Sequence, residues 1–474
     1  MTDVVLITCP MVFSKERAKI GDESTNPWMG VLYLAAYLEK EGFSVKVYDP
    51  GAEGLLLNEI IGRLKKDRPK VVGFSALTSG LRTALQMAQE IKSNFANKVV
   101  VGIGGSHINV DPGFVNRHPQ FDFAVVGDGE ITLSKIVKKV MEGRKLNQKI
   151  FVGEMVQNLD DLPFPARHLI NIKNYFPREK PGGKEKPTAA IVGSRGCPYN
   201  CCFCSRSKSW RQVRFRSAKN IVDEMEEIAS DYDGKFSFTD DAITLNREVT
   251  LELCEELRKR NCHFHWLGMT RADLLDEELI SKMKEAGCEE LFFGVESGNL
   301  RVRNQIIGKN LTDEEIKKAI FFCQKHKIRA SVFLMLGFPT ETKKELAETV
   351  NFGLKFQPDF IGVHQTLPLP GSEVFKIAVK EGQIFADLID QYAEGKLGDG
   401  FVGNWPVYVP AGMTKEYLLE AKKRAYRRFY LNPRWILRRF KLWFIDKNAF
   451  THDFSLIKTG IYVLIFGRSQ NAAA

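Results

Sequence analysis

Short runs of consecutive apolar residues alternate with helix-like stretches over the first 150 residues. The apolar runs lie at 4–7, 45–48, 71–74, 99–103 and 124–126, and the helical spacing of apolar residues is clearest at 27–40 and 81–95. Continuous apolar runs are typical of parallel strands that are buried on both faces, with helices as the crossover connections. The pattern therefore predicts an α/β fold that begins with a Rossmann-like, doubly wound parallel sheet over residues 1–150.

The same rhythm returns between residues 188 and 385. Six more strands are expected, with a helix at 218–230 after the first of them, and we place the strands at 188–192, 236–238, 263–267, 290–295, 330–336 and 360–364. Six parallel strands with helices between them predict a partial (β/α)6 barrel, whose chemistry should lie at the carboxyl ends of the strands.

Proline and glycine clusters separate these two regions. They lie at 163–165 and 181–187 and mark residues 151–187 as a linker. Residues 386–474 predict a mostly helical C-terminal domain, in which helices at 415–430 and 434–444 are broken by Asn432 and Pro433.

The charge of the chain is concentrated near its end. The formal net charge is +10, and residues 415–447 hold eleven Lys or Arg against three acidic residues, interleaved with aromatic side chains. Such a basic, aromatic segment fits an anionic membrane surface, RNA or a solvated helix face. The sequence has neither a secretory signal nor an apolar run long enough to cross a membrane, so we expect a cytoplasmic protein that could contact a membrane peripherally.

Three cysteines within eight residues carry the clearest chemistry. Cys197, Cys201 and Cys204 form a C-x3-C-x2-C pattern, which gives three thiolates to a four-iron cluster and leaves one iron without a protein ligand. A zinc site is disfavoured because no second cysteine or histidine pair follows at a suitable spacing. A disulfide framework is disfavoured because nine cysteines in 474 residues are odd in number and sparse. Cys202 breaks the spacing and is interpreted as a packing residue.

This loop, with Phe203 before its last cysteine, resembles the signature of the radical S-adenosylmethionine (SAM) enzymes. The resemblance implies a [4Fe-4S] cluster whose open iron chelates SAM, and reductive cleavage of SAM to a 5′-deoxyadenosyl radical. It also implies an electron donor, namely a reductase with flavodoxin or ferredoxin.

Polar residues follow three of the expected barrel strands. By the same resemblance, Asp240 and Asp241 lie where the family holds the methionyl amine, Glu296 and Ser297 approach the ribose and carboxylate, and Arg271 meets the carboxylate. Structural alternatives remain open at this stage. The two aspartates could cap a helix, Arg271 could pair with Asp273 or Glu296, and residues 296–298 could be an ordinary turn. The segments 336–342 and 367–372 also fit the family pattern.

Small and polar residues follow the strands of the first domain, where ligands of open α/β sheets bind. No G-x-G-x-x-G motif follows the first strand, which argues against a dinucleotide. Residues 101–107 and 124–130 resemble the cobalamin-binding domain fused to many radical SAM enzymes. The D-x-H-x-x-G pattern is absent, so we expect cobalamin without a histidine ligand; a degenerate domain without corrinoid is the alternative. The candidate cobalamin residues are Ser75, Thr78, Gly104, Gly105, His107, Gly127, Gly129 and Glu130.

Together these resemblances imply a cobalamin-dependent radical SAM methyltransferase. It would methylate an unactivated carbon, or phosphorus, of a small-molecule or lipid-like substrate, with methylcobalamin as methyl donor. A radical oxidative cyclase or ring-rearrangement enzyme is the alternative. A transfer-RNA methylthiotransferase is disfavoured, since the first 150 residues hold only Cys9, and we expect no nucleic-acid partner. A non-catalytic corrinoid-binding regulator would need no cysteine loop. No residue is assigned as the substrate's acid or base.

Overall fold

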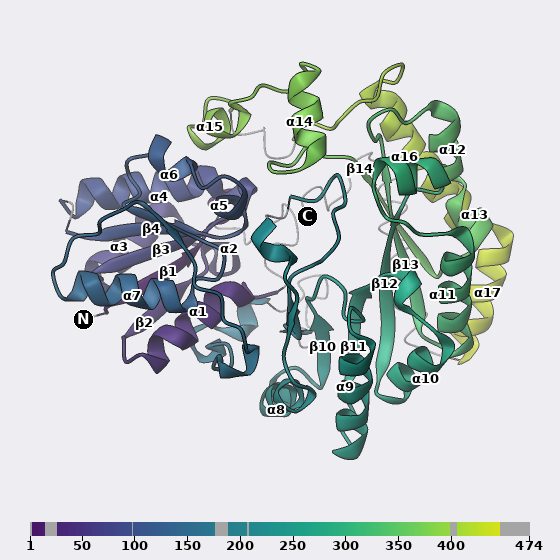
Figure 1. The fold of residues 1–474 in the computed structure, drawn as a ribbon, viewed down its shortest axis with the longest axis horizontal. Coiled ribbons are helices and arrows are strands. Elements are labelled where there is room, and N and C mark those ends of the chain that lie inside the picture. Colours follow the sequence, from purple (N-terminus) through teal and green to yellow (C-terminus); the bar gives the residue numbers. More distant parts are fainter. Residues whose placement is uncertain are drawn as a thin grey trace.

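The computed structural model describes residues 2–14, 26–96, 98–175, 188–205, 208–398 and 405–445. The chain builds two parallel sheets that lie side by side, and helices cover both faces of the first sheet and the outer face of the second (Figure 1). The predicted proline and glycine cluster at 181–187 and the end of the basic segment lie outside the described residues.

The first sheet has six parallel strands in the order β2-β1-β3-β4-β5-β6. Helices α1 (Met29–Lys40) and α7 (Glu130–Met141) pack on one face, and α3 (Leu57–Asp67) and α4 (Leu81–Asn94) pack on the other. This confirms the predicted Rossmann-like sheet. The strands are β1 (Val4–Thr8), β2 (Val45–Tyr48), β3 (Val71–Ser75), β4 (Val100–Gly104), β5 (Phe123–Val126) and β6 (Ile150–Val152).

Strand β6 was not expected from the sequence. It has three residues at the sheet edge, of which Val152 is 78% exposed. Three residues with one buried side chain show no periodicity that could identify a strand.

The second sheet also has six parallel strands, in the order β14-β13-β12-β11-β10-β7. Alternate residues of β13, such as Val332 and Leu334, pack into the core under the outer helices, because successive side chains of a strand point to opposite faces. This confirms the partial (β/α)6 barrel. The strands are β7 (Ala189–Ile191), β10 (Lys235–Phe238), β11 (His265–Thr270), β12 (Cys288–Glu296), β13 (Arg329–Leu336) and β14 (Phe360–Gln365).

Helices cover the outer face of the second sheet (Figure 1). Each begins after its strand, and several start with a side-chain cap, for example Thr312 before α11. The helices are α8 (Ala218–Ile228), α9 (Arg247–Lys259), α10 (Glu277–Glu285), α11 (Asp313–Lys325), α12 (Lys343–Val350) and α13 (Phe352–Phe356).

A third, two-stranded antiparallel ribbon was missed by the sequence analysis. It pairs β8 (Ser194–Arg195) with β9 (Arg214–Phe215), and the cysteine loop lies between these two strands. The ribbon therefore carries the loop on which the predicted chemistry depends.

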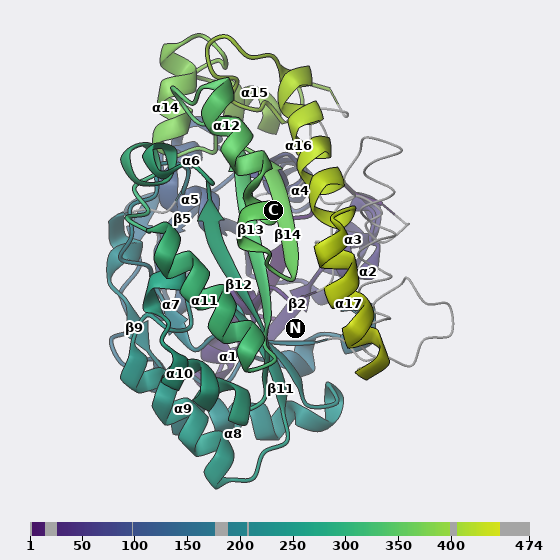
Figure 2. The same ribbon diagram turned by 90° about the vertical axis from the view of Figure 1, so that its right-hand side faces the viewer.

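The described C-terminal residues are mostly helical, with turns and irregular segments at 394–398 and 405–414. Helix α14 (Glu373–Lys380) precedes α15 (Leu388–Ala393), which packs Tyr392 and Ile389 into the core of the first sheet. Helices α16 (Lys415–Tyr430) and α17 (Pro433–Ile445) lie on the second sheet, on the side away from the first (Figures 1 and 2). None of the helices in the described ranges has the length and apolarity needed to span a membrane.

Part of the basic segment is committed to internal contacts. Arg439 is 2% exposed and donates to Asp359, and Arg438 donates to the carbonyl oxygens of Gln357 and Pro358. These two arginines therefore hold α17 against the second sheet. Contact of the basic segment with a membrane stays a prediction.

Candidate functional site

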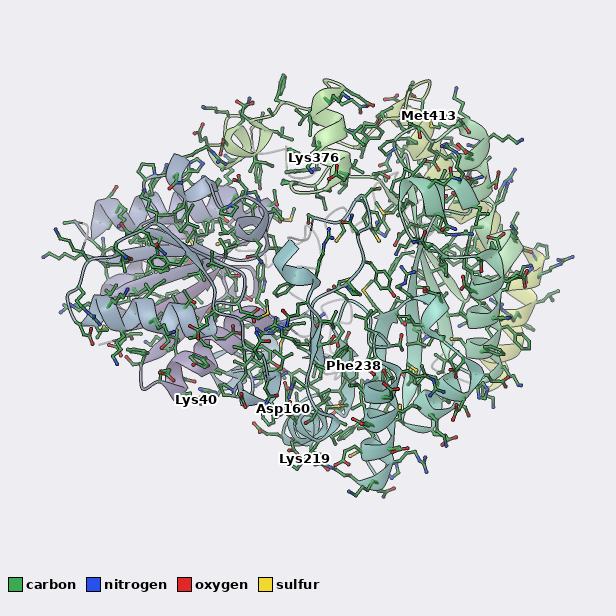
Figure 3. The ribbon with its side chains drawn as sticks, viewed as in Figure 1. Lys40, Asp160, Lys219, Phe238, Lys376 and Met413 are labelled. Carbon is green, nitrogen blue, oxygen red and sulfur yellow. The ribbon has the colours of Figure 1, made fainter. Side chains whose placement is uncertain are left out.

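A cavity of about 530 Å³ lies between the two sheets. Its walls come from the carboxyl ends of β3, β4 and β5 on one side, and from the ribbon, the cysteine loop and the end of β10 on the other. Figure 3 places Phe238, the last residue of β10, at the inner edge of the second sheet. Parallel strands direct their carboxyl ends to one edge of a sheet, which explains why the two sets of polar loops meet.

Six of the eight predicted cobalamin residues line this cavity. They lie at or just beyond the carboxyl ends of β3, β4 and β5, and they are Ser75, Gly104, Gly105, Gly127, Gly129 and Glu130. Gly127, at φ +89°, has no protein atom within 4 Å of the position that a Cβ would take, so the space beside it is open to a ligand. Gly105, at φ +98°, packs against the protein instead, since a Cβ there would lie 2.7 Å from the backbone N and O of Ala76. A backbone floor free of side chains is what a flat, bulky corrinoid needs, so these residues fit the group.

The remaining two, Thr78 and His107, are bonded to each other. Thr78 Oγ1 lies 3.0 Å from His107 Nδ1, and His107 Nε2 lies 3.8 Å from Asp111 Oδ2. Burial lowers the pKa of His107 to about 4, so the ring is neutral near pH 7. Neither residue is among those lining the cavity, and the contacts of His107 are those of a core histidine.

The cysteine loop is held by backbone contacts at both ends. Gly196, at φ +105°, packs so closely that a Cβ would lie 2.3 Å from Gln212 O. Cys197 N donates to Trp210 O at 2.9 Å, and Cys202 N donates to Ile307 O at 3.1 Å. Within the described ranges no three His, Cys, Asp or Glu side chains converge on one metal ion. Three thiolates on one loop are a donor set for an iron–sulfur cluster, in which each iron takes one thiolate.

An apolar layer lies behind the loop. Cys201, Cys202 and Phe203 pack against the buried side chains of Val302, Ile307 and Phe338. The ring centroids of Phe203 and Phe338 are 6.0 Å apart. This layer shields one side of the loop from water, and Cys202 is a packing residue in it, as expected.

The two adjacent aspartates have different surroundings. Asp240 accepts from Gly193 N at 2.8 Å and from Ser194 Oγ at 2.6 Å, and burial raises its pKa to about 6. Asp241 lines the cavity. The structure therefore ties Asp240 to the start of the ribbon and places Asp241 toward the ligand space.

Arg271 connects the end of β11 with the cysteine loop. Its Nη2 donates to Lys309 O at 2.6 Å and to Asp273 Oδ2 at 2.9 Å, and its guanidinium carbon lies 3.8 Å from the ring centroid of Tyr199. The pairing with Asp273, which was the structural alternative for Arg271, is present. Nη1 is buried and has no hydrogen-bond partner, so one donor of Arg271 remains available to an anionic ligand.

Glu296 ends β12 in a left-handed conformation, with φ +68°. Its Oε1 lies 3.0 Å from Nζ of Lys309, a buried lysine that the sequence analysis missed. Burial opposes the charge of Lys309, but Glu296 offsets this and the pKa of the lysine is raised. Ser297 is fully buried, and its hydroxyl lies 3.1 Å from that of Thr349. The pair could not be predicted from the sequence, because a single lysine in a loop belongs to no motif and only the fold brings Lys309 next to Glu296.

The comparisons with known proteins agree with this geometry. The Radical SAM superfamily model matches residues 191–353, and the B12 binding domain model matches residues 22–137. An uncharacterized methyltransferase of Pyrococcus horikoshii is 28% identical over 97% of this chain and 98% of its own. The anaerobic magnesium-protoporphyrin IX monomethyl ester cyclase of Rubrivivax gelatinosus is 28% identical over 85% of this chain and 73% of its own.

A solved structure shows the same fold over nearly the whole chain. The cobalamin-dependent S-adenosylmethionine radical enzyme OxsB, with aqua-cobalamin bound, superposes with a TM-score of 0.71 at 16% identity, covering 98% of this chain and 72% of that chain. The present chain thus combines a radical SAM barrel with a B12-binding sheet. It belongs to the cobalamin-binding-domain radical SAM enzymes, whose cofactors are a [4Fe-4S] cluster, SAM and cobalamin.

Proposed function

We propose that this protein transfers a methyl group to an unactivated carbon or phosphorus atom of a small-molecule or lipid-like substrate. The observation that carries the proposal is the single cavity that Cys204 shares with the glycine loops of the first sheet. A shared cavity lets a radical generated beside the cysteine loop and a methyl group held by the first domain reach one substrate. When bound, the cofactors supply hydrogen abstraction and the methyl group.

The chain's own residues would bind and orient these groups. Cys197, Cys201 and Cys204 would hold the cluster. Arg271, through its unpartnered Nη1, would bind a carboxylate of SAM, and Asp241 on the cavity wall would meet its amine, since a zwitterion needs partners of both signs. Glu296, Lys309 and the ring of Phe203 lie next to one another outside the cavity lining and would border the cluster side of the cysteine loop. Asp240 and Ser297 would position these neighbours.

The cobalamin site would be formed by the six cavity-lining residues of the first sheet. Glu130 Oε2 is buried without a hydrogen-bond partner, so it would accept from a ligand amide. We do not propose His107 as a ligand of cobalt, because its contacts with Thr78 and Asp111 hold the side chain in the core.

An oxidative cyclase is the second candidate, supported by the cyclase relative from Rubrivivax gelatinosus. Methyl transfer is favoured because the match to the methyltransferase relative covers 97% of this chain and 98% of the relative. A transfer-RNA methylthiotransferase stays disfavoured. Cys9, the cysteine of the first domain, is 1% exposed and its pKa is raised by burial, which suits a packing residue.

Isotope transfer separates the two candidates. The protein would be reconstituted without air, supplied with a flavodoxin or ferredoxin reducing system, and incubated with cell extract and SAM labelled on its methyl group. A methyltransferase gives a labelled product whose mass rises by one methyl group. A cyclase consumes SAM to 5′-deoxyadenosine and gives an unlabelled product, and that outcome would replace the proposal.

A further inference from the structure

The ribbon that carries the cysteine loop places arginines on one face. Arg195 of β8 lies directly opposite Arg214 of β9, and residues directly opposite in an antiparallel pair share a face. Arg216 follows two positions after Arg214 and therefore points to the same side. Like charges that face each other destabilise a strand pair, so this face requires carboxylates.

Arg195 and Arg214 pair with carboxylates that follow β5 of the first sheet, whereas Arg216 pairs with Glu224 of α8. Arg214 Nη1 donates to Asp128 Oδ2 at 2.5 Å, and Arg195 Nη2 donates to Glu130 Oε1 at 2.7 Å. Arg195 Nη1 also lies 3.6 Å from Asp128 Oδ1. The side chains of Asp128 and Glu130 are only 2% and 3% exposed. The pairs are therefore buried between the halves of the molecule, where removal of one partner leaves an uncompensated charge.

Further contacts tie the same face to the first half of the chain. Arg214 Nη1 donates to Val156 O at 2.5 Å, Arg216 Nη1 donates to Tyr33 Oη at 3.2 Å, and the Arg195 guanidinium lies 5.1 Å from the centroid of the Tyr33 ring. The opposite face of β8 belongs to the barrel, since Ser194 Oγ donates to Asp240. The ribbon thus makes hydrogen bonds to both halves of the molecule.

The loop at residues 127–130, called the glycine loop below, is also packed on the side away from the ribbon. A Cβ on Gly153 would lie 1.8 Å from Asp128 O, so β6 packs directly against the back of this loop. Gly127 N donates to Asn109 Oδ1 at 2.7 Å. Any displacement of the ribbon therefore has to be taken up at residues 127–130, which line the cavity.

We propose that Arg214, acting with Arg195 on Asp128 and Glu130, is a positioning residue that fixes the cysteine loop relative to the glycine loop. Arg214 does not itself line the cavity, so it acts through Asp128, which does line it. The inference rests on the proposed function only in that the two loops are the cluster and corrinoid sites. The claim that Arg214 holds the two loops in place, called the mechanical part below, concerns the protein without its cofactors.

Hydrogen–deuterium exchange of the apoprotein tests the mechanical part. Arg214→Gln removes the charge, and Arg214→Lys keeps the charge but cannot reach both Asp128 and Val156 O with the guanidinium fork. We expect amides at 124–133 and 196–205 to exchange about tenfold faster in Arg214→Gln, with a smaller increase in Arg214→Lys. Unchanged exchange at 124–133 in both variants would overturn the proposal.

Arg439→Gln is the matched control. Arg439 is also buried and also donates to a buried aspartate, Asp359, but it lies on α17, away from the first sheet (Figure 1). Exchange at 124–133 is expected to remain at the wild-type rate in this variant. Faster exchange there in the control would mean that any lost buried arginine loosens the loop, which also overturns the proposal.

The loaded enzyme gives an independent readout. In Arg214→Gln we expect the cluster to form and SAM to be cleaved, while the ratio of 5′-deoxyadenosine released to methyl groups transferred rises about tenfold. An unchanged ratio contradicts the positioning role. A wild-type protein that binds no corrinoid would instead refute the proposed function, and the exchange result on the apoprotein would still decide the inference.

Discussion

The guanidinium carbon of Arg271 lies 3.8 Å from the ring centroid of Tyr199, a residue inside the cysteine motif. This stacking, together with the bonds from Arg271 Nη2 to Asp273 and Lys309 O, fixes the guanidinium while leaving Nη1 without a partner. A fixed arginine with one buried, unsatisfied nitrogen is suited to bind an anion. The loop proposed to bind the cluster and the residue proposed to bind SAM are therefore one structural unit.

Replacement of Arg271 should weaken SAM binding specifically. Arg271→Lys keeps the charge but loses the stacking and the fork, so we expect the KM for SAM to rise about tenfold. Tyr199→Leu should raise it in the same direction by a smaller factor. Arg258→Lys is the control, since this exposed arginine lies 3.5 Å from Glu285. Steady-state formation of 5′-deoxyadenosine measures all three, and a wild-type KM in Arg271→Lys would contradict the role.

Alanine substitutions should distinguish the three cysteines proposed as cluster ligands from Cys202, which is a packing residue. Alanine at Cys197, Cys201 or Cys204 is expected to abolish the cluster, because each iron–thiolate bond comes from a single residue. Cys202→Ala should keep full iron content and lose about 1 kcal/mol of stability through lost packing. Iron analysis and visible absorbance after anaerobic reconstitution measure this. Retained iron and nucleoside release in a triple alanine variant would remove the basis of the assignment.

Gly105 provides a test of the corrinoid cavity. Gly105→Ala requires φ +98° and puts a Cβ 2.7 Å from the Ala76 backbone, so we expect a stability loss of about 1–3 kcal/mol and loss of corrinoid binding. Gly42→Ala is the control, since Gly42 also has a positive φ of +87° but faces open space away from the cavity. Titration with cobalamin followed by absorbance compares them. Equal corrinoid affinity in the two variants would contradict this cavity.

The sequence predicted both sheets because short continuous apolar runs that alternate with helical patterns indicate strands buried on both faces. It missed the ribbon, since strands of two residues, such as β8, cannot display a period of two. It also missed the partnership of Arg214 and Asp128, which are 86 residues apart; neither residue shows a local pattern, and only the meeting of the sheets pairs them. His107 follows a strand as expected, but the direction of its side chain depends on Thr78 and Asp111, which spacing does not reveal.

Glu341, after β13, should make stability depend on pH. Its Oε2 accepts from Gly337 N at 2.7 Å and Phe338 N at 3.1 Å, while Oε1 is buried without a partner. Burial raises its pKa to about 7. The folded state then holds a proton that the unfolded state releases above about pH 4.3, so this carboxyl's contribution to stability falls as the pH rises from about 4.3 to 7.

Glu341→Gln should remove that loss, because the amide oxygen still accepts from both backbone amides and the group does not ionise. At pH 7.5 we expect the free energy of unfolding of the variant to be about 2–3 kcal/mol higher than that of wild type, with little difference at pH 4.5.

Glu345→Gln should have the opposite pH dependence. Hydrogen bonding to Arg301 lowers the pKa of Glu345 to about 2, so the stabilisation that the Glu345 carboxylate contributes is present above about pH 4.3 and is lost as the pH falls toward 2. Urea unfolding at several pH values measures both, and a pH-independent difference between wild type and Glu341→Gln would contradict the raised pKa.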